Sequence, residues 1–223
     1  MTDPNPILSI LTEAAHGRPP PADGQLVVLP SAPGPTQAVL SFTAHHIVAA
    51  DIEAEVVRSR IDPDDLSAPM SAGFLLFLSG WLGMEPGVLD VLLAAPEPTE
   101  PTIELWPRDD LADHPRIRRA ARYRPALTVH ADTAHGPHKG LVVVGQGFAG
   151  RWEMAYEVEP AHRGDGLGRR LAGAATALVP PGEPVFAQVS PGNVASLRCC
   201  LAAGFTPIGS EVLFSAHPGA SRP

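Results

Sequence analysis

Glycine and arginine residues gather in segment 158–171, VEPAHRGDGLGRRL, and these residue types are suited to binding phosphate groups. The glycines are Gly164, Gly166 and Gly168, and the arginines are Arg163, Arg169 and Arg170. Glycine lets the backbone approach a phosphate without interference from a Cβ atom. A strand is expected to end before this turn and a helix to begin directly after it. The unpaired N–H groups and the dipole of that helix would attract an anion, so the segment predicts an anion-binding turn.

Two phosphate-binding motifs fit this turn poorly. A Rossmann fingerprint requires G-x-G-x-x-G in a βαβ unit, whereas this turn reads G-x-G-x-G after an apparent antiparallel meander. A P-loop requires a lysine after its last glycine, and Lys139 is the only lysine of the chain. Two interpretations stay open from the turn alone. One is an enzyme that binds nucleotide phosphates in another way, and the other is an ordinary glycine-rich turn with solvated arginines.

Two carboxylates lie on the strand expected before the turn, Trp152–Val158. Strand alternation places Glu153 and Glu157 on one face, opposite the face that carries Tyr156 and Val158. A carboxylate at such a place could act as a general base. Both glutamates are equally compatible with solvated positions on a strand.

Histidines flank a Gly-Pro loop in the second half of the chain: His130, His135 and His138. Their spacing matches no established metal site, and no cysteine lies near them. We therefore expect no metal.

The second half of the chain has the pattern needed to position the turn. Three strands are expected, Ala126–His130, Leu141–Val144 and Trp152–Val158, and the turn-rich connections between them indicate an antiparallel meander. A basic helical stretch precedes the meander, and leucines at helical spacing follow the turn. A strand at Val185–Val189 and a helix that starts at Asn193 come next.

The first half gives a weaker pattern. Strands are expected at Leu26–Leu29 and Ala38–Phe42, and helices at Asp51–Ile61 and Phe74–Trp81. The proline-rich segment 96–102 is the best linker. The expected domains are a flexible leader 1–24, an N-terminal lobe 25–100, a catalytic or binding domain 101–215 and a tail 216–223. The lobe is either separate or supplies the first elements of the main domain together with a cover on the substrate side.

Composition excludes several classes of protein. The chain has 223 residues with 44% hydrophobic residues, which rules out disorder over the whole length. Its net charge of −8 does not suit a nucleic-acid binder. The N-terminus has no signal-peptide pattern, and the longest uncharged run, 67–84, is typical of a buried helix rather than a membrane span. Two adjacent cysteines fit a reducing cytoplasm, and the dominance of arginine over lysine is typical of a high-GC bacterium.

The turn and the last helix together resemble a known family. The pattern V-x-P-x-x-R-G-x-G-x-G is similar to the acyl-CoA loop of the GNAT superfamily of N-acetyltransferases. Asn193, Ser196 and Gly204-Phe205 resemble the N-x-x-[SA] … G-F segment of that family, in the same order and with one strand between. The resemblance covers 150–214 well and 115–150 by pattern alone. It implies an α/β fold with a mixed, mostly antiparallel sheet and helices on both faces, here with an N-terminal α/β extension.

The resemblance also implies a bound acetyl-CoA as co-substrate. The strand that ends at Val158 and the strand Val185–Val189 would splay apart, and the pantetheine arm would lie between them. The backbone at Val158 would pair with that arm, and its N–H could stabilise the oxyanion. Asn193 and Ser196 would lie near the arm, although both also fit an ordinary helix N-terminus. The pyrophosphate would be held by the backbone of Arg163, Gly164, Asp165, Gly166, Leu167, Gly168 and Arg169.

The sequence departs from the family at one position that bears on catalysis. Family members commonly have a tyrosine seven residues after the asparagine, and here this position is Cys200. Three alternatives stay open: Cys200 donates a proton to the departing thiolate, Tyr156 does so, or the thiolate leaves unaided. The helical pattern places Val194, Leu197 and Leu201 toward the core and Cys200 at the edge of that face.

The function implied is transfer of an acetyl group from acetyl-CoA to the amine of a small molecule or peptide. Either Glu153 or Glu157 would be the base, and Cys200 is the candidate acid. The alternative is a non-catalytic module that binds CoA. We expect a cytoplasmic protein with no nucleic-acid or membrane partner, and a homodimer is left open.

Overall fold

The computed structural model describes residues 5–216, which form two compact units. Of these residues, one unit contains 5–91 together with 208–216, and the other contains Leu92–Pro207. The sequence instead predicts a lobe over 25–100 and a domain over 101–215. The difference arises because the last strand of the chain pairs within the first unit. Apart from residue 216, the predicted tail lies outside the described residues.

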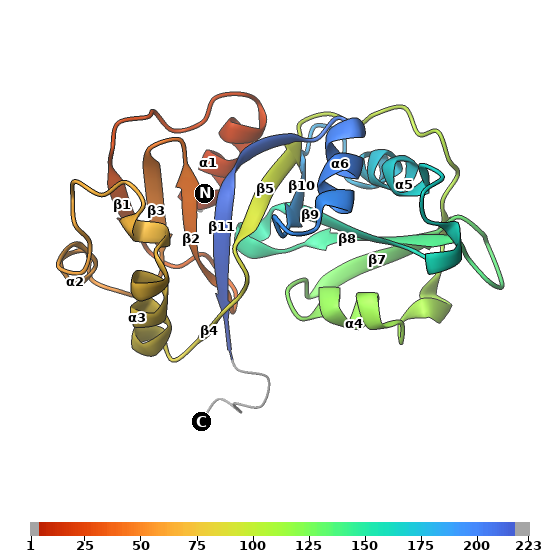
Figure 1. The fold of residues 1–223 in the computed structure, drawn as a ribbon. Helices are drawn as coiled ribbons and strands as arrows, with labels where there is room; N and C mark the ends of the chain where they lie inside the picture. Colours follow the sequence, from red (N-terminus) through yellow and green to blue (C-terminus); the bar gives the residue numbers. More distant parts are fainter. Residues whose placement is uncertain (1–4, 217–223) are drawn as a thin grey trace. The chain divides into compact units, whose positions relative to one another are not determined.

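The first unit is built on a small mixed sheet (Figure 1). Its strands are β1 (Leu26–Leu29), β2 (Gln37–Phe42), β3 (His45–Ala49), β4 (Glu85–Pro86) and β11 (Thr206–Ser215). The order is β1-β3-β2-β11, with β1 parallel to β3 and the other pairs antiparallel. The strand β4 pairs with the end of β11. The apolar pattern of the sequence predicts two short strands here, Thr206–Ile208 and Glu211–Phe214, whereas the structure has the continuous β11.

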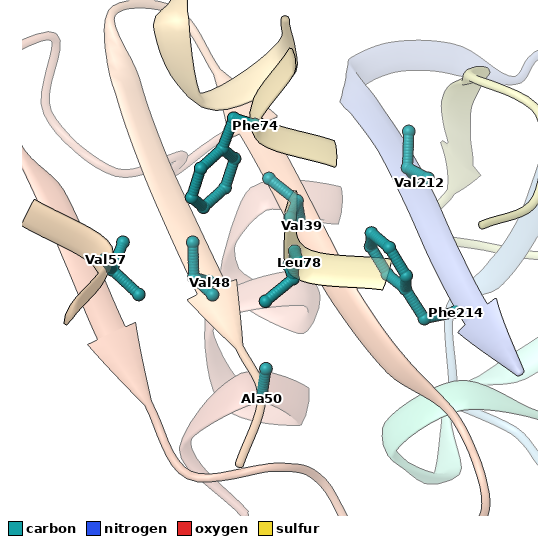
Figure 2. Packing of buried hydrophobic residues seen from close by; sticks show 8 residues of the cluster. All are labelled: Val39, Val48, Ala50, Val57, Phe74, Leu78, Val212 and Phe214. Atoms are coloured by element: carbon teal, nitrogen blue, oxygen red, sulfur yellow. The ribbon is translucent and has the colours of Figure 1, made fainter. Parts of the chain in front are cut away.

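Two helices cover this sheet and complete its core, α2 (Ala54–Arg58) and α3 (Ala72–Leu82). Ser71 begins α3 by accepting a hydrogen bond from Phe74 N (3.3 Å), and Gly83 ends it at φ +62°. Phe74 and Leu78 are one helical turn apart and therefore face the sheet together. Figure 2 shows the core that they form with strand and helix residues: Val39, Val48, Ala50, Val57, Phe74, Leu78, Val212 and Phe214.

Much of the predicted flexible leader 1–24 is helical, because residues Pro6–Ala15 form α1. Asn5 accepts a hydrogen bond from Ile7 N (3.1 Å), and Ile7 and Leu11 are buried on one face of the helix. The apolar periodicity of PILSILTEAA is the signal that the prediction overlooked in favour of the proline-rich stretch that follows.

The second unit contains a larger, mostly antiparallel sheet in the order β5-β10-β9-β8-β7-β6 (Figure 1). Its strands are β5 (Asp90–Ala95), β6 (Trp106–Pro107), β7 (Ala126–Ala131), β8 (Gly140–Gln146), β9 (Trp152–Val158) and β10 (Val185–Val189). The strands β6 to β9 form the predicted antiparallel meander, and β9 and β10 run parallel.

Helices cover both faces of this second sheet (Figure 1). The helix α4 (Pro115–Ala121) packs on one face through Ile117 and Ala120. The helices α5 (Leu167–Ala175) and α6 (Val194–Ala202) contact each other on the opposite face. The predicted mixed α/β fold, with a mostly antiparallel sheet and helices on both faces, is confirmed. Short 3₁₀ helices occur at Ala68–Met70, Asp109–Leu111, Phe148–Gly150, Pro160–His162 and Thr176–Leu178.

The proline-rich segment 96–102 is fixed to α5 and its following turn. Thr99 Oγ1 donates to Gly173 O (3.0 Å), and Thr99 N donates to Thr176 Oγ1 (2.9 Å). The segment therefore packs inside the second unit, and the boundary between the units falls earlier, after Val91. Among residues 5–216, no helix combines the length and the apolar character that crossing a membrane requires.

Candidate functional site

The parallel strands β9 and β10 are paired at their N-terminal ends and then separate. They are paired at Val185 with Trp152 and at Phe186 with Glu153, and at no later residue. On its other edge β9 pairs with β8 along all seven of its residues. Only the C-terminal half of β9 therefore has an edge that lacks a neighbouring strand.

Backbone groups of Tyr156 and Val158 point toward this unpaired edge. Arg116 Nη2 donates to Tyr156 O (2.9 Å), and Arg163 Nε donates to Val158 O (3.0 Å), so neither carbonyl is used by β8. In an antiparallel pair the N–H and C=O of one residue face the same side. The N–H groups of Tyr156 and Val158 therefore also face the gap between β9 and β10.

The predicted anion-binding turn lies directly after this edge. Gly164 and Gly166 have φ angles of +95° and +75°, and a Cβ atom at either would meet no other atom within 4 Å. The first helical bond of α5 is Arg170 N to Gly166 O (3.3 Å). Within residues 5–216, the N–H groups of 164–169 have no acceptor. Glycine is needed at these positive φ angles, and the open surroundings leave the N–H groups accessible to an anion.

The charged side chains of the turn are exposed. Arg163 is held against the end of β9 by its bond to Val158 O. Asp165 and Arg169 are both exposed, so the negative charge of Asp165 is solvated rather than buried against the N–H groups. An anion at the turn would meet the two arginines and the end of the α5 dipole.

Gly168 has a different role from the other glycines because it allows close packing. A Cβ atom at Gly168 would lie 3.1 Å from Cys199 Sγ and 3.2 Å from Tyr156 Cε2. The first turn of α5 can therefore lie against the Tyr156 ring and against α6 only because residue 168 has no side chain.

The Tyr156 hydroxyl lies among side chains of α6. Ser196, Cys199 and Cys200 are its neighbours, and the buried oxygen has no hydrogen-bond partner among the described residues. Burial raises the pKa of Tyr156 well above its usual value, with a smaller contribution from the thiols, while Ser196 acts in the opposite direction. The phenol is therefore neutral, and its hydroxyl can donate a hydrogen bond to a bound group.

Cys200 is fully buried, which corrects the face predicted for α6. Val194 and Leu201, expected in the core, are 56% and 48% exposed, whereas Cys200 is 0% exposed. The helix is therefore rotated relative to the prediction, and it contacts α5 where Gly168 lies close to Cys199. Burial raises the pKa of the Cys200 thiol to about 12, with a further contribution from Cys199.

Glu153 is buried in an ion-pair cluster at the N-terminal end of β9. Its carboxylate accepts bonds from Arg151 Nε (2.9 Å), Arg124 Nε (3.0 Å) and Phe148 N (3.3 Å). Burial alone would raise the pKa of Glu153, but Arg151 and Arg124 outweigh it and the pKa is lowered. A Cβ atom at Gly147 would lie 2.3 Å from this carboxylate. Glu153 is therefore an ionised structural residue with no access to a substrate amine.

Glu157 lies at the open end of β9 on the same face, as alternation predicts. Its side chain is 36% exposed, and Arg116 Nε lies 3.7 Å from Glu157 Oε2. Burial lowers the pKa of Arg116, and Glu157 opposes that shift. Of the two predicted base candidates, only Glu157 is both accessible and close to the gap.

Asn193 and Ser196 form the N-terminus of α6. Asn193 Oδ1 accepts a hydrogen bond from Ser196 N (3.2 Å). This is the ordinary helix-capping role that the sequence also allowed for these two residues. Both lie on the helix whose side chains surround the Tyr156 hydroxyl. Their structural role is thus visible, and binding by either stays a prediction.

Arg116 is the residue of this site that the sequence did not single out. It belongs to the basic stretch PRIRRAARY, 115–123, where several arginines follow one another. Nothing in that pattern tells which arginine points toward the sheet. Helix geometry gives a partial signal, since Arg116 lies one position before the buried Ile117.

Solved structures that are similar to this chain include GNAT-family acetyltransferases. One is a GNAT-family acetyltransferase from Colwellia psychrerythraea, with a TM-score of 0.40 and 15% identity, covering 65% of this chain and 62% of its own. A GCN5-related N-acetyltransferase from Kribbella flavida has a TM-score of 0.44 and 15% identity, covering 99% of this chain and 97% of its own. A tandem GNAT protein from the clavulanic acid biosynthesis pathway has a TM-score of 0.41 and 17% identity, covering 66% and 59%.

The chain thus spans about three fifths of the length of the Colwellia and clavulanic acid pathway proteins. No family model and no curated protein matches it. Because these TM-scores are below 0.5 and the identities do not exceed 17%, we infer the function from the residues of this chain.

Proposed function

We propose that the chain is an acyltransferase that moves an acetyl group from acetyl-CoA to an amine. Two features at the C-terminal end of β9 together support this proposal. The strand separates from β10 after Glu153, and a glycine turn with unpaired N–H groups follows it directly. The gap suits an extended arm with amide groups, and the turn suits a phosphate group at the end of that arm.

The residues of the site fit an acyl-CoA in chemistry as well as in placement. Among residues 5–216 nothing accepts a hydrogen bond from the N–H groups of 164–169, and a bound pyrophosphate would satisfy them. The N–H groups of Tyr156 and Val158, which face the gap, could bind the carbonyls of a peptide-like chain as an added strand does. An acyl thioester supplies a carbonyl carbon that an amine can attack.

Three groups of this chain would serve the chemistry. Val158 N–H faces the gap and would donate to the oxyanion that forms on the carbonyl. Glu157 would accept the proton of the attacking amine, directly or through one water, because an ammonium group has no free electron pair. Arg116 would hold the Glu157 carboxylate at the edge of the gap.

Tyr156 would stabilise the departing sulfur by a hydrogen bond. Its hydroxyl is neutral and has no hydrogen-bond partner in the described part of the chain, so it can donate to a thiolate. Complete transfer of the proton is disfavoured, because the raised pKa of this phenol lies above that of an ordinary thiol, about 8.5. Tyr156 would thereby supply the hydroxyl group that a tyrosine at the Cys200 position would otherwise bring.

Isothermal titration calorimetry tests the binding part of this proposal. We expect the full-length protein to bind acetyl-CoA and CoA and to show no heat with ATP or NAD. Gly166→Val should abolish binding, because the branched side chain would fill the open turn. Gly182→Val is the matched control, since Gly182 also has a positive φ (+87°) and open surroundings but lies outside the site.

The outcomes separate the alternatives. Acetyl-CoA binding that Gly166→Val leaves unchanged would contradict the assignment of the turn. Binding of ATP or NAD in place of acetyl-CoA would favour an enzyme that uses nucleotide phosphates. Binding without thiol release against a broad panel of amines would favour a non-catalytic CoA-binding module.

A further inference from the structure

We propose that the second unit contains a site for a divalent transition metal, with Zn²⁺ as the best-fitting ion, formed by His114, His138 and Glu159. One nitrogen of each histidine and one carboxylate oxygen lie within 4.8 Å of one another. His114 precedes α4, His138 lies between β7 and β8, and Glu159 follows β9. Two histidines and a glutamate form a ligand set that binds Zn²⁺ with one position left open.

The distances are close to those that a metal requires. His138 Nε2 lies 3.6 Å from Glu159 Oε1. Two ligand atoms bound to Zn²⁺ at about 2.0–2.2 Å in tetrahedral geometry are roughly 3.3–3.5 Å apart. The rings of His114 and His138 meet edge to face with centroids 5.9 Å apart. His138 and Glu159 therefore need to move little to share an ion, and all three ligand atoms lie within 4.8 Å of one another.

His138 supplies an independent indication of a ligand. Its Nε2 atom is buried and has no hydrogen-bond partner among the described residues, and the side chain is only 12% exposed. An unpaired buried nitrogen is unfavourable, and a metal ion would satisfy it. The nearest acidic atom, Glu159 Oε1, is beyond hydrogen-bond distance but well placed to share a cation.

The loop that carries His138 is held in place by a buried arginine. Arg108, 3% exposed, donates to Thr133 O (3.1 Å) and Gly136 O (3.0 Å) and pairs with Asp110. These contacts fix the part of the β7–β8 connection that comes just before His138 in the chain. A ligand held in position before binding gives a tighter metal site.

His114 is expected to be the weakest of the three ligands. Its Nδ1 accepts a hydrogen bond from Arg116 N (3.2 Å) and thereby caps α4. A neutral imidazole has one lone pair on its ring nitrogens. For His114 to bind the metal, the ion must take this lone pair in place of the Arg116 N–H group. The hydrogen bond that caps α4 is then lost. Loss of His114 should therefore weaken binding less than loss of His138 or Glu159.

Metal binding is tested on the full-length protein without a histidine tag and without acetyl-CoA, so the result does not depend on the proposed transferase activity. Calorimetry with Zn²⁺ should show one ion per chain. Titration with Co²⁺ should give the visible absorption of a four-coordinate ion, and Zn²⁺ should displace it. Absence of stoichiometric Zn²⁺ binding would overturn the proposal.

Substitutions identify the ligands. His138→Ala and Glu159→Gln should each weaken Zn²⁺ binding by about 100-fold or more, and His114→Ala by about 10-fold. His135→Ala is the matched control, because His135 lies exposed in the same loop and outside the cluster. Thermal unfolding shows whether each variant is folded. Unchanged binding in folded His138→Ala, or an equal loss in His135→Ala, would place the metal elsewhere and refute the site.

Discussion

The two ends of β9 have similar sequences and different roles. Glu153 and Glu157 are on one face of the same strand, four residues apart, and each lies near an arginine. At the N-terminal end β9 is paired on both edges, and Glu153 is 1% exposed between Arg151 and Arg124. At the C-terminal end one edge is free, and the Glu157 side chain is 36% exposed.

Strand pairing, more than residue type, determines what a carboxylate can do on β9. Where β10 continues the sheet, the carboxylate is desolvated and must be neutralised by fixed cations. Where β10 has departed, the carboxylate keeps access to solvent and to any group in the gap. This contrast, and the roles of the side chains beside it, lead to five testable predictions.

The largest effect is expected for Glu157→Gln. If Glu157 is the base, kcat for an accepted amine should fall by roughly 10²–10⁴-fold while acetyl-CoA affinity stays unchanged. Thiol release measures the rate, and the amine comes from a prior screen. Glu183→Gln, at an exposed position in the turn before β10, is the control. Full turnover in Glu157→Gln would mean that water or another group is the base.

Glu153→Gln should instead lower the free energy of unfolding. The substitution removes the buried negative charge that accepts hydrogen bonds from Arg151 Nε and Arg124 Nε, which costs about 3–5 kcal/mol. Chemical denaturation measures the loss. If Glu153→Gln is as stable as the wild type, the buried cluster does not support the fold and the contrast between the two ends fails.

The same residue predicts a pH dependence of stability. The pKa of Glu153 in the folded protein is below its ordinary value of 4.5. The stabilisation is therefore complete above that value and is lost as the pH falls through the folded-state pKa. Unfolding curves measured from pH 7 down to pH 3 should show this loss in the wild type and a smaller one in Glu153→Gln.

Tyr156→Phe should lower kcat by about 10–100-fold, because a hydrogen bond to a charged group contributes about 1.5–3 kcal/mol. The ring and its packing against Gly168 are kept, and within residues 5–216 the hydroxyl has no hydrogen bond to lose. Folding stability should therefore not fall. An unchanged kcat in Tyr156→Phe would show that the thiolate leaves without help from this residue.

The smallest effect is expected for Cys200→Ala, with less than about a tenfold loss of kcat. The thiol is fully buried and has a raised pKa of about 12, so it is a poor acid for a thiolate.

Loss of the buried Cys200 sulfur should lower the free energy of unfolding by about 1 kcal/mol, or roughly 2–4 °C in Tm. Cys200 should also resist thiol reagents in the native protein when Cys199 is replaced. A thousandfold loss of kcat would make Cys200 an obligatory acid.

Local signals predicted most of the second unit. The meander, the glycine turn, and the helices that follow it were expected from alternation, helical spacing and capping residues, each of which depends on near neighbours in the sequence. The prediction failed at α1, where a proline-rich stretch masked an amphipathic helix. It also failed for α6, because burial there depends on contact with α5 rather than on the apolar pattern of the helix itself.

The sequence by itself determined the anion-binding turn and the alternation of β9, since glycine conformations and strand periodicity are properties of adjacent residues. The tertiary structure alone decided that Glu153 is neutralised while Glu157 is accessible, and that the Tyr156 hydroxyl lies beside Cys200. It also decided that His138 meets Glu159. These pairings join residues from different elements, and only the packing of the sheet and its helices brings such residues within the few ångströms over which charges and hydrogen bonds act.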